Sequence, residues 1–579
     1  MRNQDVAKVL MDIAAALELK GENAFRMRAY EDAARHIADM REDVDAMARD
    51  KRLTEIPGVG PSIAEKIAGY LATGRSPYLE ALLKEVPTGA FELLQVPGIG
   101  PSKANQLFRH LQITSIKELE KAAREHRIRE VPGMGAKTEE AIAKELTRLQ
   151  ARSVRLPLSV AWPLADKVAA MLRGVAAVEQ VEPAGSIRRR KETIGDIDLL
   201  VASKHAAEVE RAIAHWGFTR EILSAGPTKI QFLTLDNFQV DVRIVDPSTW
   251  GAALQHFTGS KAHNIALRER ATRMGYKVNE YGVFKLDTDE RVGGATEEEV
   301  YEILGLEWMP PEIREHTGEL EAAENGTLPN LVTMDDILGD FHAHTTYSDG
   351  RASLEEMARA AIARGYQYLV ITDHSYSLGV TQGLTEDKAE AQWAAIEALN
   401  QKLAPFRILR GVELEIRSNG ELDFPSDFLG RFDVVSASVH TGQRQGSEQI
   451  TERMLNALLE PNVHILNHPS GRLLSRRQPY EFDFETVLQV AKVRGKALEI
   501  NGSFDRLDLN DVAARRAREL GVRLSMGSDA HTPRNLDDMR FAVALARRAW
   551  CEPDDLLNCM SLDQLLKWLE KPKKKAKSR

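Results

Sequence analysis

The chain has 579 residues and a formal net charge of −9, and 43% of its residues are hydrophobic and 28% are charged. This length exceeds what one hydrophobic core can hold, so we expect about three to five domains, and the acidic balance argues against a simple nucleic-acid coat protein. The sequence lacks a long uncharged apolar run and a secretory leader pattern, and its only cysteines are Cys551 and Cys559. It therefore predicts a cytoplasmic protein without a membrane span or a disulfide framework.

The N-terminal part has a helical pattern followed by a repeat. Apolar residues recur at helical spacing within residues 1–50, and three Pro-Gly-x-Gly turns then separate pairs of short helical runs. The repeat glycines are Gly58 and Gly60, Gly98 and Gly100, and Gly133 and Gly135. Such turns expose backbone amides at the start of the following helix, where phosphate binds. One copy would be equally consistent with an ordinary turn between two helices, but three copies favour phosphate binding. The repeat resembles the helix-hairpin-helix motif, which binds the DNA backbone independently of sequence.

From about residue 155 strands alternate with helices. Residues 231–235 and 238–245 predict two strands joined by a turn at Asp236 and Asn237. Asp196 and Asp198 lie on one face of an earlier strand, because side chains alternate along a strand, and Asp241 is placed to join them. Three converging carboxylates suit two magnesium ions about 3.5–4 Å apart for phosphoryl transfer.

A glycine and a serine precede these carboxylates. Gly185 and Ser186 begin eleven residues before Asp196 and suit a backbone amide and a hydroxyl placed against a triphosphate, with Arg189 to neutralise its charge. The alternative is an exposed Asp-x-Asp strand with a chance third carboxylate. The glycine-serine pair at this spacing argues against that alternative.

The last 240 or so residues have a different pattern. Residues 317–338 are acidic and turn-rich, and we expect the main linker there. Beyond it, seven strand-like runs alternate with helices, near residues 340, 368, 408, 434, 464, 497 and 523. Such alternation predicts a parallel α/β barrel, and barrels of this kind carry their sites at the C-terminal ends of the strands.

Nine side chains of types that bind metal ions lie at or near these strand-like runs. They are His342, His344, Asp349, His374, Glu413, His440, His468, Asp529 and His531. Imidazole and carboxylate are the usual protein ligands of zinc, manganese and iron, and multi-metal sites mostly hydrolyse phosphate esters. Asp373 and Glu499 lie beside these residues in the sequence and are candidates to hold the ligands by hydrogen bonds.

The motifs together resemble known families. Gly-Ser-(x)8-Gly-Asp-x-Asp resembles the nucleotidyltransferase superfamily, and with Phe257-Thr-Gly-Ser260 and Val278-Asn-Glu-Tyr281 it resembles the family X DNA polymerases. The C-terminal part resembles the PHP (polymerase and histidinol phosphatase) domain, and the order of the two parts resembles bacterial members of family X. The resemblance implies a polymerase that fills short gaps in DNA repair, with a 3′–5′ exonuclease in the barrel. Abasic-site cleavage and 3′-phosphatase activity stay open.

The resemblance also implies a multidomain α/β fold. Its parts are a helical, lyase-like domain at 1–85, fingers with further hairpins at 86–153, a palm with a mixed sheet at 154–246, an α+β thumb at 247–316, the linker at 317–338, a seven-stranded (β/α) PHP barrel at 339–570 and a basic tail at 571–579. The tail carries six positive charges, without which the body stands at −15. A solvated end and a weak DNA-binding arm are equally consistent with it.

By the resemblance, Asp196, Asp198 and Asp241 hold Mg²⁺ or Mn²⁺ in the polymerase centre. The residues implied at the incoming nucleotide are Gly185, Ser186, Arg189, His256, Gly259, Ser260, Lys261, Asn264 and Arg268. Two of them depart from the eukaryotic DNA polymerase beta. His256 replaces a tyrosine that helps to exclude ribonucleotides, so sugar discrimination is left open. Lys261 replaces an acidic residue, and its positive charge predicts tighter nucleotide binding before DNA engages.

The nine barrel residues match the full ligand set of active PHP domains. Nine ligands fit three ions of Zn²⁺ or Mn²⁺, or of iron, with Glu413 as a bridge. Lys66 matches the Schiff-base lysine of the 5′-deoxyribose-phosphate lyase of this family. A supporting lysine is replaced here by Ser62, and an exposed helix lysine is the commoner role for such a residue.

The implied partners are gapped or primer-template DNA and deoxynucleoside triphosphates, bound by a monomer. Two other functions remain to be weighed. One is a small-molecule phosphoesterase fused to a nucleotidyltransferase that does not act on DNA, against which the three hairpins argue. The other is a polymerase whose barrel is only structural, against which the complete ligand set argues.

Overall fold

The computed structural model describes residues 3–575 except 21–23, 41–43, 86–92, 94–95, 97, 154 and 475. The chain forms two compact units, Met1–Val154 and Arg155–Arg579, each of which is described by itself. None of the described helices is long and apolar enough to cross a membrane.

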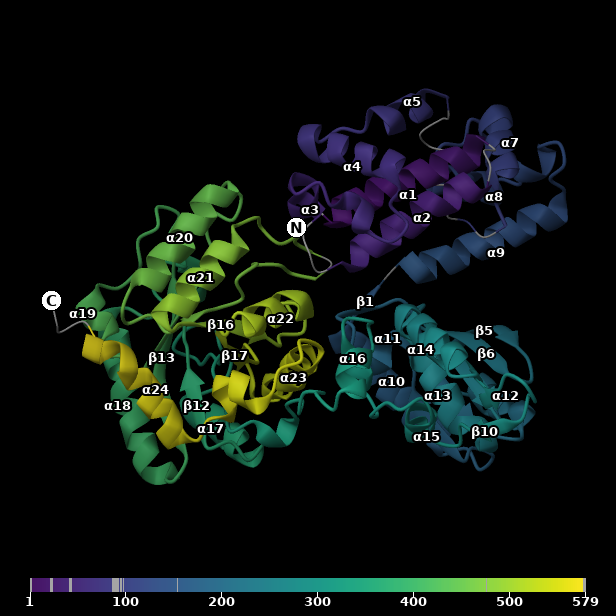
Figure 1. Ribbon diagram of the computed structural model, residues 1–579. Coiled ribbons are helices and arrows are strands. Elements are labelled where there is room, and N and C mark those ends of the chain that lie inside the picture. Colours follow the sequence, from purple (N-terminus) through teal and green to yellow (C-terminus); the bar gives the residue numbers. More distant parts are fainter. Residues whose placement is uncertain are drawn as a thin grey trace. The chain divides into compact units, whose positions relative to one another are not determined.

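The first unit is helical, as the sequence predicts (Figure 1). Its helices are α1 (Asn3–Lys20), α2 (Ala24–Asp39), α3 (Val44–Arg49), η1 (Leu53–Glu55), α4 (Pro61–Thr73), α5 (Pro77–Glu85), α7 (Pro101–Leu111), α8 (Ile116–Arg124), η2 (Ile128–Glu130) and α9 (Ala136–Ser153). Two separate apolar cores form, one from Val6 to Leu82 and one from Leu93 to Leu146. The expected boundary at 85/86 adjoins residues 86–92, which lie outside the described residues, and it stays a prediction.

Each described glycine turn has the same backbone conformation. Gly58, Gly98 and Gly133 have φ values of +83°, +85° and +81°, in the left-handed region that glycine adopts without strain. The first turn joins η1 to α4 and the third joins η2 to α9, so these two copies are helical hairpins as predicted. The first helix of the second copy lies largely outside the described residues, and its turn leads into α7.

The second unit begins with a mixed five-stranded sheet in the order β2-β4-β7-β6-β5. Its strands are β2 (Gln180–Pro183), β4 (Ile197–Ala202), β5 (Thr219–Ala225), β6 (Lys229–Thr234) and β7 (Gln239–Val245). The predicted pair β6 and β7 is antiparallel with its turn at Asp236 and Asn237, whereas β4 runs parallel to β7. This palm sheet is accompanied by the short strands β1 (Leu156–Pro157) and β3 (Thr193–Ile194) and by α10 (Leu158–Arg173), α11 (Gly185–Arg188) and α12 (Ala206–Ala214).

A smaller thumb follows, in which helices pack against the three-stranded sheet β10-β9-β8. Its elements are η3 (Pro247–Thr249), α13 (Trp250–Thr258), α14 (Lys261–Arg273), β8 (Tyr276–Asn279), β9 (Gly282–Lys285), β10 (Arg291–Gly293), α15 (Glu297–Ile303) and η4 (Pro311–Ile313).

The segment expected to be a linker is packed. Residues 317–338 contain α16 (Glu319–Glu324) and η5 (Met334–Asp336), and Leu320 and Ala323 belong to the thumb core. The acidic pattern is misleading because Glu319 is fully buried and accepts a hydrogen bond from His263 at 2.7 Å. Part of the expected linker is therefore packed in the thumb core, and its bounds at 317–338 stay a prediction.

The C-terminal part is a parallel seven-stranded sheet in sequence order, as predicted. Its strands are β11 (Gly339–Asp340), β12 (Tyr368–Ile371), β13 (Arg407–Glu415), β14 (Val434–Ser438), β15 (Ile465–Leu466), β16 (Ala497–Asn501) and β17 (Arg523–Gly527). A parallel bridge between Ala343 and Ala530 brings the two edges of the sheet together, so that a nearly closed barrel results.

Helices surround this barrel. They are α17 (Leu354–Ala363), η6 (Gly379–Thr381), α18 (Glu386–Leu403), α19 (Ser426–Leu429), α20 (Ser447–Leu459), α21 (Phe484–Arg494), α22 (Asp511–Glu519), η7 (Pro533–Asp538), α23 (Met539–Arg548), η8 (Pro553–Asp555), η9 (Leu557–Cys559) and α24 (Leu562–Lys575). Leu565 and Leu569 of α24 share a buried cluster with residues at the starts of strands, such as Tyr368, Val434 and Ala497. The last helix thereby covers the N-terminal ends of the strands and leaves the C-terminal ends for a site.

Two candidate metal centres

The palm brings together the three predicted carboxylates. Asp198 on β4 is paired in register with Asp241 on the parallel strand β7, and Asp196 immediately precedes β4. One ligand atom of each lies within 4.8 Å of those of the other two. Burial and the charges of Asp196 and Asp241 raise the pKa of Asp198 to about 7. Carboxylates that raise one another's pKa in this way are suited to binding divalent cations, whose charge offsets their mutual repulsion.

Asp241 is also held by neighbours that sequence reasoning did not identify. Gln231 donates its Nε2 to the carboxylate at 2.9 Å, Gln239 donates at 2.7 Å, and the Lys229 Nζ lies 2.7 Å away. Gln239 is two residues from Asp241 on the same face of β7, so strand alternation indicates that contact. The Gln231 and Lys229 contacts depend on the pairing of β6 with β7.

The turn before α11 approaches the carboxylates closely. Gly185 has φ +56°, and a Cβ built there would lie 2.1 Å from Oδ2 of Asp198. Only glycine fits this position, because a methyl group would both clash and strain the backbone. Gly185 and Ser186, the first residues of α11, thus lie next to the three palm carboxylates, as the motif predicts.

Two consecutive arginines follow, and each has a different environment. Arg188 pairs with buried Glu297 at 2.7 Å and also donates to the Thr258 hydroxyl at 2.7 Å. Arg189, the predicted triphosphate ligand, donates its Nη1 to the Thr258 carbonyl at 2.5 Å and its Nε to Glu315 at 3.1 Å. The guanidinium of Arg189 therefore has a carboxylate partner within the protein.

The other predicted nucleotide residues lie on α13 and α14 or in the turn between these helices. A Cβ at Gly259 would lie 3.3 Å from Nη1 of Arg189, so these two residues adjoin one another. Ser260 accepts a hydrogen bond from the His263 backbone N–H at 3.2 Å and so caps α14. Asn264 donates to the His256 carbonyl at 2.7 Å and accepts from Gln255 at 2.8 Å, which fixes its amide.

His256, Lys261 and Arg268 are more accessible. Burial lowers the pKa of His256, whose half-buried ring packs edge-on against Phe257. Lys261 and Arg268 are exposed on α14. Their side chains are therefore accessible from solvent.

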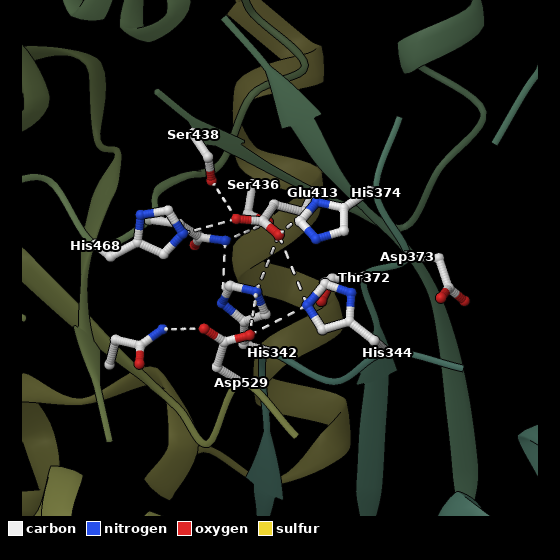
Figure 2. Close-up of polar contacts among 12 residues, drawn as sticks. His342, His344, Thr372, Asp373, His374, Glu413, Ser436, Ser438, His468 and Asp529 are labelled. Atoms are coloured by element: carbon white, nitrogen blue, oxygen red, sulfur yellow. Dashed lines mark hydrogen bonds and ion pairs between the residues drawn. The ribbon is translucent and has the colours of Figure 1, made fainter. Parts of the chain in front are cut away.

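The barrel brings together all nine predicted ligands. Three groups have ligand atoms within 4.8 Å of one another: His344, Asp349, His374 and His531; His342, His344 and Asp529; and His374, Glu413 and His440. The groups share members, so they form one continuous cluster. His468 joins it through Glu413, whose Oε1 lies 2.8 Å from its Nε2. Figure 2 shows part of this cluster, in which the side chains of His342, His344, His374, Glu413, His468 and Asp529 are directed toward one another.

Glu413 of β13 lies at the centre of the cluster (Figure 2). Its carboxylate oxygens lie 3.0 Å from His374, 3.3 Å from His342 and 3.3 Å from His440. Burial acts to raise the pKa of Glu413, but the charges of these histidines hold it well below its usual range. A carboxylate with imidazoles on both oxygens suits a bridging position between ions.

The donor set fits metal ions. Several ring nitrogens are buried and have no hydrogen-bond partner among the described residues, namely His342 Nε2, His344 Nδ1 and Nε2, His440 Nε2 and His468 Nδ1. A buried imidazole nitrogen without a partner costs free energy unless it ligates something. Histidine and carboxylate are the donors that zinc, manganese and iron accept, so the cluster has the composition of a multi-metal centre.

Hydrogen-bond partners orient these ligands. Glu499 accepts from Nδ1 of His342 at 2.6 Å, in line with the sequence prediction. Asp373 is directed away from the cluster (Figure 2) and binds the loop before Asp349, accepting from the Thr345 backbone N–H at 2.8 Å. Glu415, which sequence reasoning missed, lies 2.9 Å from Nδ1 of His440. Its position two residues after Glu413, on the same strand face, was the available signal.

The predicted lyase residue has an ordinary environment. Lys66 on α4 donates its Nζ to the Ser62 hydroxyl at 2.8 Å and to the Ser62 carbonyl at 3.0 Å, and it lies 4.7 Å from the Tyr78 ring centroid. The serine at the position of the supporting lysine therefore contacts Lys66 directly.

Four family models match the chain. They are a helix-hairpin-helix domain at residues 1–76, a helix-hairpin-helix tandem at 91–148, the DNA polymerase beta thumb at 253–315 and the PHP domain at 340–503. The DNA polymerase/3′-5′ exonuclease PolX of Bacillus subtilis (strain 168) is 36% identical over 573 residues, which are 99% of this chain and 100% of the relative.

Shorter relatives match less than half of the chain. A probable phosphatase of Thermoanaerobacter sp. (strain X514) is 31% identical over 248 residues, 41% of this chain and 96% of the relative. A probable phosphatase of Shewanella sp. (strain MR-4) is 30% identical over 231 residues, 38% of this chain and 86% of the relative. The full-length match, the thumb and hairpin models and the PHP domain together show that the chain belongs to the PolX family, the family X DNA polymerases that carry a C-terminal PHP domain.

Proposed function

We propose that this protein extends DNA 3′ ends at short gaps in repair and removes nucleotides from 3′ ends at a second centre. The observation that carries this proposal is the presence of two separate clusters of metal-type ligands, one in the palm and one in the barrel. The Bacillus subtilis relative, which the chain matches over its whole length, is named for both activities.

In the palm, Asp196, Asp198 and Asp241 would hold Mg²⁺ or Mn²⁺. Such ions lower the pKa of an attacking hydroxyl and neutralise charge on the transferred phosphoryl group. Gly185 keeps the backbone close enough for its neighbour Ser186 to meet the triphosphate. Arg189 would exchange Glu315 for a phosphate when the nucleotide binds. The thumb residues proposed around the nucleotide are His256, Gly259, Ser260, Lys261, Asn264 and Arg268.

In the barrel, the nine clustered residues would hold Zn²⁺, Mn²⁺ or iron. Bound ions of this kind activate water and polarise the scissile phosphate. Glu413 would hold two ions together, while Glu499 and Glu415 fix the ring orientation of His342 and His440. In the first unit, the backbone amides after the Pro-Gly-x-Gly turns would hold DNA phosphates without reading sequence. The protein would do this as a monomer.

The experiment uses a primer-template with a one-nucleotide gap and Mg²⁺ or Mn²⁺. The wild type is compared with Asp196→Ala/Asp198→Ala and with His342→Ala/His344→Ala. We expect extension to be lost only in the first variant and 3′ degradation only in the second. Degradation that persists in the histidine variant would assign the barrel a structural role. Extension that persists without the aspartates would overturn the palm assignment.

Lyase chemistry at Lys66 is tested separately. Borohydride traps a Schiff base formed between a lysine and abasic DNA. Trapping by the wild type that disappears in Lys66→Ala would assign the reaction to this residue, and the absence of trapping in the wild type would exclude it.

A further inference from the structure

A cavity of about 780 Å³ opens beside the barrel cluster. Its lining includes His440, Arg444, Arg476, Arg477, Pro479 and Tyr480. The residues come from the loops that follow β14 and β15, which leave the sheet at its C-terminal end. His440 belongs to the metal-type cluster, so the cavity is continuous with the candidate centre. Its volume lies in the range of ordinary ligand sites.

The cavity is positively charged. Its described lining contains three arginines and no acidic residue. Arg477 donates its Nε to the Gly471 carbonyl at 2.8 Å, which fixes its guanidinium without neutralising it. Arg476 has a carboxylate neighbour in Asp505, at 3.5 Å, but its side chain is 68% exposed, so that pair is weak. Net positive charge is thus concentrated next to a centre that is itself expected to bind cations.

Buried polar atoms near this cavity lack partners. Tyr480 lines the cavity, and its buried hydroxyl has no hydrogen-bond partner among the described residues. Nη1 of Arg506 is also buried without such a partner. Arg506 lies against the cluster, with its Nε 3.2 Å from Asp529. Burial and the charge of Arg506 lower the pKa of Arg477, although Asp505 and Asp508 oppose this shift. An anion that accepts hydrogen bonds would satisfy both the unpartnered donors and the repelling charges.

We propose that this cavity binds the sugar-phosphate backbone of the DNA strand upstream of the bond that the barrel cleaves. The proposal rests on the exonuclease function proposed for the barrel. In that reaction the oxygen of a water molecule bonds to the phosphorus of the last nucleotide. The bond from phosphorus to the 3′ oxygen of the preceding nucleotide breaks, and that oxygen takes a proton to become the new 3′ end. The next phosphate of the strand then lies one nucleotide away from the metal cluster, where Arg477, Arg476 and Arg444 are placed to meet it.

Several arginines distinguish a strand from a small phosphate ester. A single terminal phosphate would be held by the metal cluster itself, and the lateral arginines would have nothing to bind. A strand carries one charge per nucleotide, so successive phosphates use several guanidiniums. The cavity therefore predicts that the barrel binds a DNA strand in preference to a mononucleotide. The shorter relatives, in contrast, are named as probable phosphatases.

The test compares two substrates of the full-length protein loaded with Mn²⁺. One is a single-stranded oligonucleotide, and the other is the p-nitrophenyl ester of thymidine 5′-monophosphate, a phosphodiester without an upstream phosphate. For Arg477→Met and for Arg444→Met/Arg476→Met, we expect KM for the oligonucleotide to rise about tenfold or more. The loss should be confined to the oligonucleotide. Arg359→Met is the matched control, because Arg359 is an exposed arginine of α17 that pairs with Glu355.

The outcomes separate the proposals. Equal losses on both substrates would place the arginines in the metal centre and overturn a strand site, and unchanged oligonucleotide cleavage would remove the cavity from the strand path. A wild type that cleaves neither substrate would overturn the exonuclease function itself. Salt dependence gives a readout that needs no variant. Log kcat/KM of the wild type for the oligonucleotide should fall with log salt more steeply than that for the ester, by a slope of about 0.7 for each upstream phosphate held. Equal slopes would contradict the proposal.

Discussion

Arg548, on α23 of the barrel, lies 3.1 Å from Glu315, the same carboxylate that holds Arg189 of the palm. Arg548 also donates to the Arg189 carbonyl at 2.7 Å and pairs with Asp511, and its side chain is only 2% exposed. Nearby, Trp162 of the palm packs edge-on against Phe541 of the barrel. The palm and the barrel are therefore joined by a buried polar network, and a residue proposed to bind nucleotide is part of it.

The first prediction concerns this network. Arg548→Met should destabilise the unit Arg155–Arg579 by about 3–5 kcal/mol, because Glu315 and Asp511 would each lose a buried ion-pair partner. It should also raise KM for the incoming nucleotide, since Glu315 would then hold Arg189 more tightly. Urea unfolding and gap-filling kinetics measure the two effects. Arg547→Met is the control, because Arg547 pairs at the same interface with Glu312 and does not touch Arg189. Equal effects of both substitutions on the nucleotide KM would contradict the prediction.

The second prediction concerns the turn beside the palm carboxylates. Gly185→Ala should reduce gap filling by at least about 100-fold, because the new methyl group would displace Asp198 or the turn. Nuclease activity should remain, since the barrel ligands are separate. Gly217→Ala is a matched control, because no heavy atom lies within 4 Å of a Cβ built at that position. Normal extension by Gly185→Ala would show that the close approach is not needed.

The third prediction concerns removal of metal from the barrel. Chelation should abolish 3′ degradation and lower the melting temperature, because the unpartnered imidazoles lose their ligands and a bound ion stabilises the folded state. An ion present at 100 times its Kd contributes about 2.7 kcal/mol. Differential scanning calorimetry before and after Mn²⁺ or Zn²⁺ is restored measures the change. His342→Ala/His344→Ala should show a smaller metal-dependent shift, and an equal shift would place the stabilising ion elsewhere.

The fourth prediction concerns pH and the thumb. Burial lowers the pKa of His263 below 6.5, although Glu319 opposes this shift. In the unfolded chain the His263 imidazole binds a proton as the pH falls below about 6.5, whereas in the folded thumb it stays neutral. The free energy of unfolding therefore decreases as the pH falls below that value. The slope approaches about 1.4 kcal/mol per pH unit for one proton. Urea midpoints from pH 7.5 to 5 measure it for wild type and His263→Gln. The difference in stability between the two should shrink toward low pH, and a constant difference would contradict the assignment.

Much of this protein could be predicted from local sequence. The seven barrel strands, the palm hairpin at Asp236 and Asn237 and the repeated glycine turns follow from short periodicities and from backbone conformations that few residues adopt. The barrel ligands could be recognised because almost every one lies at or beside a short apolar run. Parallel strands place such positions at a common edge, whatever the details of packing.

Other features depended on contacts between distant segments. Glu319 belongs to an acidic stretch that reads as a linker, yet it is buried because His263, 56 residues earlier, pairs with it. Arg477 lines a cavity with His440, and Arg548 reaches Arg189 across 359 residues. The sequence by itself determined the elements, the ligand types and the family, because these are set by local patterns. Only the tertiary structure decided which charges are buried, which arginines stay unneutralised and how the palm meets the barrel, because burial and pairing depend on which surfaces the folded chain brings together.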